Sequence, residues 1–173
     1  MQALLAALLA TALTSLGSRD QMLVAHLASR LGRSYGLLTV ALLVTSATTI
    51  LAAWAGSSVS AMLPAPAKMM LVAMALVLAA IELAWPRRLA MADDPTRSLG
   101  AIGIVLAAYQ MTDAARFLVF ALAAAFASPV FAAVGGILGG FAATLLGWTL
   151  AADLARWPVG AIRRTLAVFL LLT

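Results

Sequence analysis

The chain has 173 residues, of which 65% are apolar and 10% are charged. Soluble domains carry about 25% charged residues, and a small water-soluble fold cannot hide this much apolar surface. Together with a mean hydropathy of +1.09, these values exclude an ordinary soluble enzyme, a disordered chain and a nucleic-acid-binding module. They predict an all-α membrane protein that crosses the bilayer several times, with the lipid bilayer as its first partner.

The net charge of +5 fits membrane orientation better than nucleic-acid binding, because the basic residues are mostly arginines at the ends of apolar runs. There is no cysteine, which excludes disulfides and thiolate metal sites. His26 is the single histidine, which excludes a multi-histidine zinc site. We find no phosphate loop, nucleophile–base pair or cofactor fingerprint, and we expect neither an enzyme nor a resident cofactor.

The apolar runs predict six transmembrane helices. A polar break lies in the middle of the first, around Arg19 and Asp20, and another in the fourth, around Asp113 and Arg116. Residues 56–66 are rich in Gly, Ser and Pro and are typical of a loop. The expected spans are residues 2–31, 35–55, 67–85, 99–127, 129–152 and 160–173.

The basic residues predict the orientation of these spans. Since six spans alternate sides, arginines collect at the helix ends on one side, and the other side has only Lys68. By the positive-inside rule the arginine-rich loops are cytoplasmic and both termini face outward, as in a protein of the bacterial inner membrane. The arginines in question are Arg30, Arg33, Arg87, Arg88, Arg97, Arg156, Arg163 and Arg164.

The two polar breaks indicate an internal repeat, because they lie 95 residues apart, from Ser15 to Gln110. At an offset of 94, Trp54 aligns with Trp148. The expected units are a three-helix repeat at 1–85, a cytoplasmic linker at 86–98 and a second three-helix repeat at 99–173. Because three is odd, the halves have inverted topology, a common plan of secondary transporters with a site at the repeat interface. The alignment carries the last helix past Thr173, so we expect a short last helix or a C-terminal truncation.

At both breaks the sequence resembles the Gdt-type cation/proton exchangers, the family of the Golgi transmembrane protein 165, which carry the motif Glu-x-Gly-Asp-(Lys/Arg)-(Ser/Thr) in the first helix of each of two repeats. In the first motif Ser15 stands at the Glu position. Gly17 matches, Ser18 stands at the Asp position, Arg19 matches the basic position, and Asp20 stands at the hydroxyl position. The resemblance implies a six-helix fold and exchange of Ca²⁺ or Mn²⁺ against protons.

The second motif is also degenerate. Gln110 stands at the Glu position, Thr112 at the Gly position, and Asp113 matches, whereas Ala114 and Ala115 replace the basic and hydroxyl residues. The segment 154–164 and glycine pairs in the fifth span also resemble the family. One of four family carboxylates therefore remains in place.

A hard divalent cation needs about six or more oxygen ligands, several of them anionic, so we expect a weakened or altered ion site with Asp113 as the best single metal ligand. On a continuous helical wheel Ser15, Ser18 and Arg19 share one face, while Asp20 points elsewhere. Because Asp113 and Arg116 are three residues apart, we expect Asp113 to pair with Arg116 or Arg19. The candidate residues of the ion pathway are Ser15, Gly17, Ser18, Arg19, Asp20, Gln110, Thr112, Asp113 and Arg116.

Residues outside the motifs have simpler expected roles. We expect His26 to be a hydrogen-bonded interface residue and Glu82 an interfacial residue beside the end of its span. Small and hydroxyl residues predict tight helix packing, in the second span at Thr39, Thr45, Ser46, Thr48 and Thr49 and in the fifth at Gly135, Gly136, Gly139 and Gly140.

Two functions of different class follow. The first is a Ca²⁺/Mn²⁺:H⁺ antiporter-like transporter with an altered ion site. The second is a transport-inactive accessory or structural subunit of a larger membrane complex, or of a homodimer, that uses the same fold. The retained fold and Asp113 favour the first function, and the missing carboxylates favour the second.

Overall fold

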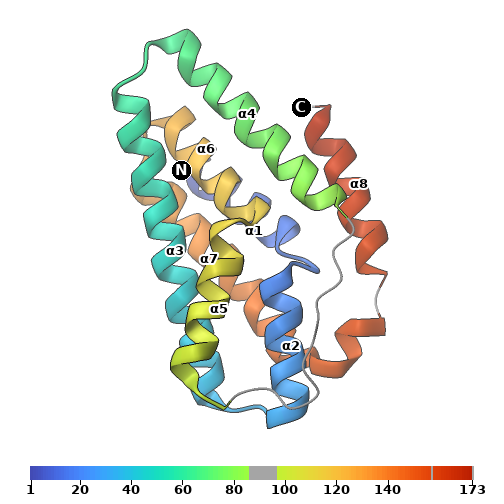
Figure 1. The fold of residues 1–173 in the computed structure, drawn as a ribbon. Coiled ribbons are helices and arrows are strands. Elements are labelled where there is room, and N and C mark those ends of the chain that lie inside the picture. Colours follow the sequence, from blue (N-terminus) through green and yellow to red (C-terminus); the bar gives the residue numbers. More distant parts are fainter. Residues whose placement is uncertain (86–96, 157, 173) are drawn as a thin grey trace.

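The computed structural model describes residues 1–85, 97–156 and 158–172, and all regular structure in these ranges is helical (Figure 1). The predicted linker 86–98 lies outside the described residues except for its last two. The helices are α1 Gln2–Thr14, α2 Arg19–Leu31, α3 Tyr35–Ala61, α4 Ala65–Ala84, α5 Leu99–Met111, α6 Ala114–Phe126, α7 Pro129–Leu150, the 3₁₀ helix η1 Ala151–Arg156, and α8 Val159–Leu171.

Three of these helices, α3, α4 and α7, are long and apolar enough to cross a membrane, and the pair α5 and α6 forms a fourth candidate span with a bend of 58°. These helices fit the predicted integral membrane protein. Its outer surface is apolar, as lipid contact requires: Leu43, Ile50, Trp54, Met70 and Ile104 are each more than half exposed.

The two predicted polar breaks are places where the helix stops and starts again. Residues 15–18 separate α1 from α2, and Gly17 there has a φ of 69°, a left-handed conformation that favours glycine. Ser18 caps α2 by accepting a hydrogen bond from the Gln21 N–H. Between α5 and α6 the break is shorter, and Asp113 stands before the first turn of α6 with extended backbone angles.

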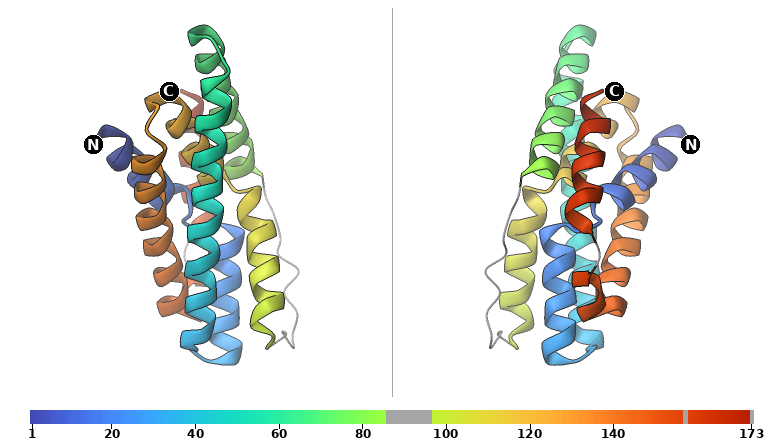
Figure 2. Two further views of the ribbon diagram at one scale, coloured as in Figure 1. Left: turned by 90° about the vertical axis from the view of Figure 1, so that its left-hand side faces the viewer. Right: turned by 90° about the vertical axis from the view of Figure 1, so that its right-hand side faces the viewer.

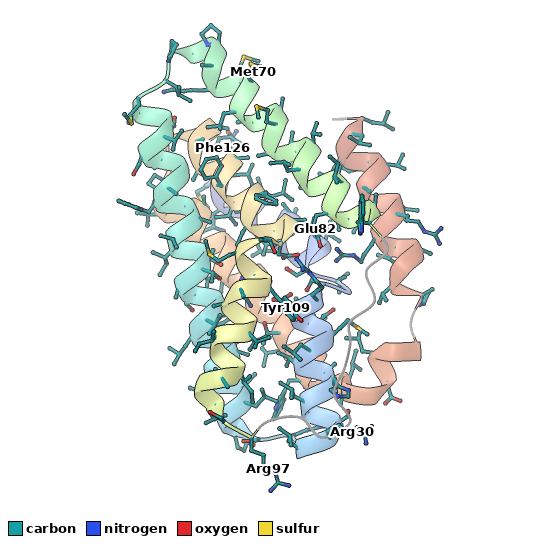
Figure 3. The ribbon with its side chains drawn as sticks, viewed as in Figure 1. Arg30, Met70, Glu82, Arg97, Tyr109 and Phe126 are labelled. Atoms are coloured by element: carbon teal, nitrogen blue, oxygen red, sulfur yellow. The ribbon has the colours of Figure 1, made fainter. Side chains whose placement is uncertain are left out.

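The helices form one bundle in which the broken pairs lie against the long helices (Figures 1 and 2). α1 and α6 occupy one half of its length and α2 and α5 the other, while α3 runs along both halves. Both termini lie in the half that contains α1 and α6. The labelled Arg30 and Arg97 mark one end of the bundle and Met70 the opposite end (Figure 3).

The glycines of α7 bring its backbone against those of α1 and α2, which confirms the predicted tight packing of this helix. A Cβ on Gly139 would lie 2.9 Å from the backbone nitrogen of Ala12, and one on Gly147 would lie 2.9 Å from the carbonyl oxygen of Gln21. No side chain larger than hydrogen fits at either position without a shift of the neighbouring helix.

The predicted loop 56–66 is wrong for its first half, because α3 continues as a helix to Ala61. Gly56 faces the backbone of Phe120 on α6, where an added Cβ would lie 2.9 Å from the carbonyl carbon. The Ser60 hydroxyl donates to the Ala124 carbonyl oxygen at 3.1 Å. The glycine and serine therefore serve helix packing, and the turn is confined to residues 62–64.

Candidate functional site

The two breaks meet inside the bundle, although they lie more than 90 residues apart in sequence. The Gln110 amide nitrogen donates to Asp20 Oδ2 at 2.8 Å. Beside this contact, Arg19 Nη2 donates to Thr112 Oγ1 at 2.8 Å, and its guanidinium lies 5.2 Å from the ring centroid of Tyr109. Sequence motifs that were predicted to lie at one interface are thus in direct contact.

Gln110 is the centre of this contact and is 1% exposed. Its amide nitrogen donates to Asp20 and, at 3.0 Å, to Thr45 Oγ1. Its carbonyl oxygen accepts from Thr48 Oγ1 at 2.8 Å and from Arg116 Nη2 at 2.7 Å. The amide therefore lies between a carboxylate and a guanidinium, with its donors toward the anion and its acceptor toward the cation, and all its hydrogen-bonding capacity is used.

The predicted pairing of Asp113 with Arg116 or Arg19 is wrong. Arg116 binds Gln110 and, through Nε at 3.1 Å, the Thr48 hydroxyl. Arg19 binds Thr112. Asp113 is 3% exposed, and its Oδ2 has no hydrogen-bond partner among the described residues. The i, i+3 spacing does not pair the two residues because Asp113 precedes α6 with extended backbone angles, so its side chain does not share a helical face with that of Arg116.

The prediction that Asp20 points away from the face of Ser18 is also wrong. Asp20 is 7% exposed and accepts from the Ser18 hydroxyl through Oδ1 and from Gln110 through Oδ2. The helical wheel assumed a continuous helix, but the left-handed Gly17 turns α2 relative to α1. Asp20 therefore supplies a second buried carboxylate at the junction, beside that of Asp113.

Several buried hydroxyl groups near the motifs have no partner in the described part of the chain. They belong to Thr11, Ser15 and Thr49. Thr11 and Thr49 both face Gly136 of α7, where a Cβ would lie 3.6 Å from Thr11 Oγ1 and 2.8 Å from Thr49 Cγ2. Buried oxygens without donors are available as ligands for a proton, a water molecule or a cation.

These residues fit a divalent cation poorly. No group of three or more His, Cys, Asp or Glu side chains that could hold a metal ion occurs in the described ranges. The junction offers two carboxylates, those of Asp20 and Asp113, and neutral oxygens, whereas Ca²⁺ or Mn²⁺ as cargo needs several anionic ligands. The buried Arg116 competes for the same oxygens.

A second charged contact was not predicted from the sequence. Arg163 of α8 forms an ion pair with Glu82 of α4, with Nη2 2.8 Å from Oε2, and its Nη1 lies 3.5 Å from the carbonyl oxygen of Thr14 at the end of α1. Glu82 is 4% exposed, so its carboxylate lies inside the bundle. The one available signal was that both charges lie within apolar runs, where an unpaired charge is costly.

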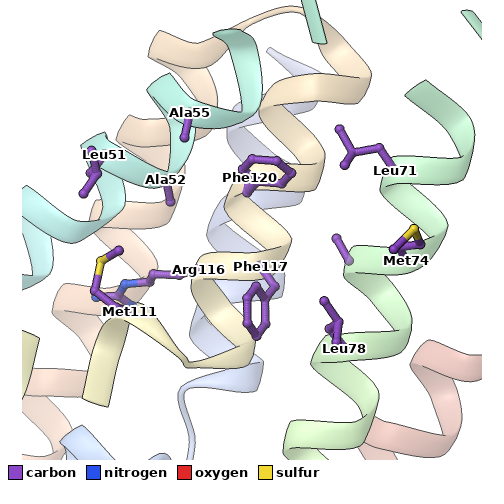
Figure 4. Close-up of a pocket in the computed structure, with 11 residues that line it drawn as sticks. Leu51, Ala52, Ala55, Leu71, Met74, Leu78, Met111, Arg116, Phe117 and Phe120 are labelled. Atoms are coloured by element: carbon purple, nitrogen blue, oxygen red, sulfur yellow. The ribbon is translucent and has the colours of Figure 1, made fainter. Parts of the chain in front are cut away.

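A pocket of about 300 Å³ lies between α3, α4 and α6 and reaches the second break (Figure 4). Its lining is apolar apart from Arg116, which lies beside Met111 at one end. Phe117 and Phe120 form the side contributed by α6. No corresponding sequence signal exists, because the lining residues are ordinary apolar residues of three separate helices.

Comparison of the chain with models of protein families, with curated proteins and with solved structures finds no match.

Proposed function

We propose that the chain is a secondary transporter of two inverted three-helix halves, similar in plan to the Gdt-type exchangers, that exchanges a small monovalent cation for protons at the junction of its two breaks. The observation that carries this proposal is the hydrogen bond between Asp20 and Gln110, which joins the two motif segments in the interior. Inverted-repeat transporters have their site at this kind of junction, between discontinuous helices.

The charges at the junction support a singly charged cargo. Arg19 is only partly buried and faces Thr112 and Tyr109. The buried charges of the junction are the carboxylates of Asp20 and Asp113 and the guanidinium of Arg116, so this buried group carries one net negative charge when both acids are ionised. A monovalent cation or a single proton neutralises this charge, whereas a dication would leave an excess positive charge in a low-dielectric interior. Unpartnered oxygens of Ser15 and Asp113 are available as additional ligands.

The proposal includes the orientation in the membrane. Arg30 and Arg97 mark the same end of the bundle (Figure 3), and the positive-inside rule assigns that end to the cytoplasm. The pairs α1–α2 and α5–α6 would each form one broken span, and α8 would be the short last span of the second half.

A transport-inactive accessory subunit is the second candidate, and the position of Arg116 favours it. Its guanidinium bonds to Gln110 and Thr48 and thereby uses oxygens that a transported cation would need. A permanent internal cation would stabilise the junction without any transported ion.

Transport by the purified protein in vesicles separates the two functions. Vesicles that contain only this protein and a pH-sensitive dye would be exposed to gradients of Na⁺, K⁺, Ca²⁺ or Mn²⁺. We expect proton movement with a monovalent ion and its loss in Asp20→Asn and Asp113→Asn, while the exposed Asp153→Asn behaves as the parent. If none of the four ion gradients drives proton movement, and the protein co-purifies stoichiometrically with a larger complex, the accessory subunit is favoured.

A further inference from the structure

The pocket between α3, α4 and α6 combines an apolar lining with one buried cation. Its volume of about 300 Å³ is at the lower end for ligand sites, which are mostly apolar with a few polar groups that fix the ligand. Leu51, Met74, Leu78 and Met111 line it and are each nearly half exposed or more. The pocket is therefore open at the lipid-facing surface of the bundle.

Arg116 is the polar group of this pocket, and its guanidinium is incompletely satisfied. It is 3% exposed, and its Nε and Nη2 donate to the neutral oxygens of Thr48 and Gln110. Within the described residues it makes no salt bridge, and its Nη1 has no hydrogen-bond partner. The carboxylates of Asp20 and Asp113 lie in the same junction and offset its charge, but among the described residues neither forms an ion pair with it. A carboxylate in the pocket would supply a direct ion pair.

We propose that this pocket binds a fatty acid anion from the surrounding membrane, with the carboxylate at Arg116 and the hydrocarbon chain along Phe117 and Phe120 toward the opening at Met74 and Leu78 (Figure 4). A carboxylate suits the guanidinium because its two oxygens match the planar arrangement of the N–H groups. The apolar walls exclude a small hydrophilic anion, which would lose its hydration without compensation.

Depth and size define the ligand further. Arg116 follows the break between α5 and α6, two helices of 13 residues each, so it lies near the middle of the membrane. A phospholipid phosphate stays at the headgroup level and does not reach this depth. At about 30 Å³ for a water-sized group, the pocket holds roughly ten such groups. This matches a chain of medium length, and longer chains extend through the opening.

The inference does not depend on ion transport, and the wild-type protein can test it. Binding of decanoate and of decan-1-ol to the purified protein in uncharged detergent would be measured by calorimetry. The two ligands have the same chain length and differ in the headgroup. We expect decanoate to bind at least tenfold more tightly than the alcohol. Equal affinity, or no binding of the acid, would overturn the proposal and leave a hydrocarbon cleft.

Two pairs of variants locate the site. Arg116→Gln should lower the affinity for decanoate to that for the alcohol, while Arg164→Gln, at an exposed arginine of α8, should leave it unchanged. Ala55→Phe should block the pocket, whereas Ala47→Phe on the exposed side of the same helix should not. If Arg116→Gln does not fold, the alanine pair decides, and equal decanoate binding by both alanine variants would place the ligand elsewhere.

Discussion

The break between α1 and α2 and the break between α5 and α6 differ in what covers them. α8 lies on the first break: a Cβ on Gly17 would be 2.7 Å from Val159 Cβ, and Arg163 reaches the Thr14 carbonyl oxygen at the end of α1. At the second break α4 leaves a pocket that reaches Met111 and Arg116. Two segments with similar motifs thus differ in access, and the covering helix determines the difference.

Under the proposed function this asymmetry has a direct meaning. If the halves are inverted repeats, α4 and α8 are corresponding helices, and exchange of their positions would open the first break and close the second. Alternating access in inverted-repeat transporters is movement of one half against the other around a fixed site. The ion pair of Glu82 with Arg163 joins these two helices, so it holds the present arrangement.

The largest expected effect comes from removing that ion pair. Glu82→Leu leaves Arg163 buried without its anion, and we expect the free energy of unfolding to fall by about 3–5 kcal/mol. Adding Arg163→Met should restore most of this loss, while Arg164→Met, at the exposed neighbour, should have little effect. Thermal unfolding in detergent compares these three variants with the parent. If Glu82→Leu lowered the free energy of unfolding no more than Arg164→Met, the ion pair would have no part in closing the first break.

Bulk at Gly17 tests the closed state of the first break directly. Gly17→Val must adopt a positive φ, at a cost of about 1–3 kcal/mol, and must also displace Val159, at about 1–3 kcal/mol. We expect a loss of about 3 kcal/mol in unfolding free energy. Gly160→Val on α8 is the control, because a Cβ there meets nothing within 4 Å. A loss at Gly17 no greater than at Gly160 would mean that α8 does not pack on the break.

Cysteine labelling compares access to the two breaks at equivalent positions. The chain has no cysteine, so a variant with one introduced cysteine is labelled at that position alone. Met111 is 47% exposed, whereas Leu16, 95 residues earlier, is only partly exposed. Met111→Cys should therefore react with a maleimide several-fold faster than Leu16→Cys in the folded protein, and both should react equally after unfolding in SDS. Equal reaction rates in the folded protein would contradict the difference in access between the two breaks.

The smallest stability effect is expected at Asp113. Its Oδ2 has no partner in the described part of the chain, so Asp113→Asn should change the free energy of unfolding by less than about 1 kcal/mol. Asp20→Asn should cost about 1–3 kcal/mol, because the new amide faces the N–H groups of Gln110. Calorimetric unfolding of the two variants measures this contrast, and equal costs would contradict the different environments of the two acids.

The sequence predicted the features that follow from composition and local pattern. Charged residues within apolar runs located both breaks, and glycines four apart located the face of α7 that meets the α1 backbone. These predictions succeeded because each depends on a local feature. A charge within an apolar run interrupts the helix, and a glycine lets a neighbouring helix come close, in almost any helical fold.

The predictions that failed depend on backbone geometry at single residues. The left-handed Gly17 invalidated the helical wheel that separated Asp20 from Ser18, and the extended Asp113 invalidated its pairing with Arg116. The partners of Arg116 and Glu82 come from other helices, so they depend on tertiary packing that no local pattern specifies. Gly56 was predicted to be a loop residue, but it lies within α3 because the Phe120 backbone of α6 occupies the space of a side chain there. This contact also depends on tertiary packing.

The amide of Gln110 couples the charges of Asp20 and Arg116 electrostatically, but it cannot pass a proton between them. Its dipole aligns with the field between Asp20 and Arg116, so a change of charge at either end alters the energy of the other. Both of its N–H groups and its carbonyl oxygen are already engaged, and an amide nitrogen does not accept a proton to pass on. A proton held by Asp20 therefore has no hydrogen-bonded route through Gln110 to Arg116 and the second break.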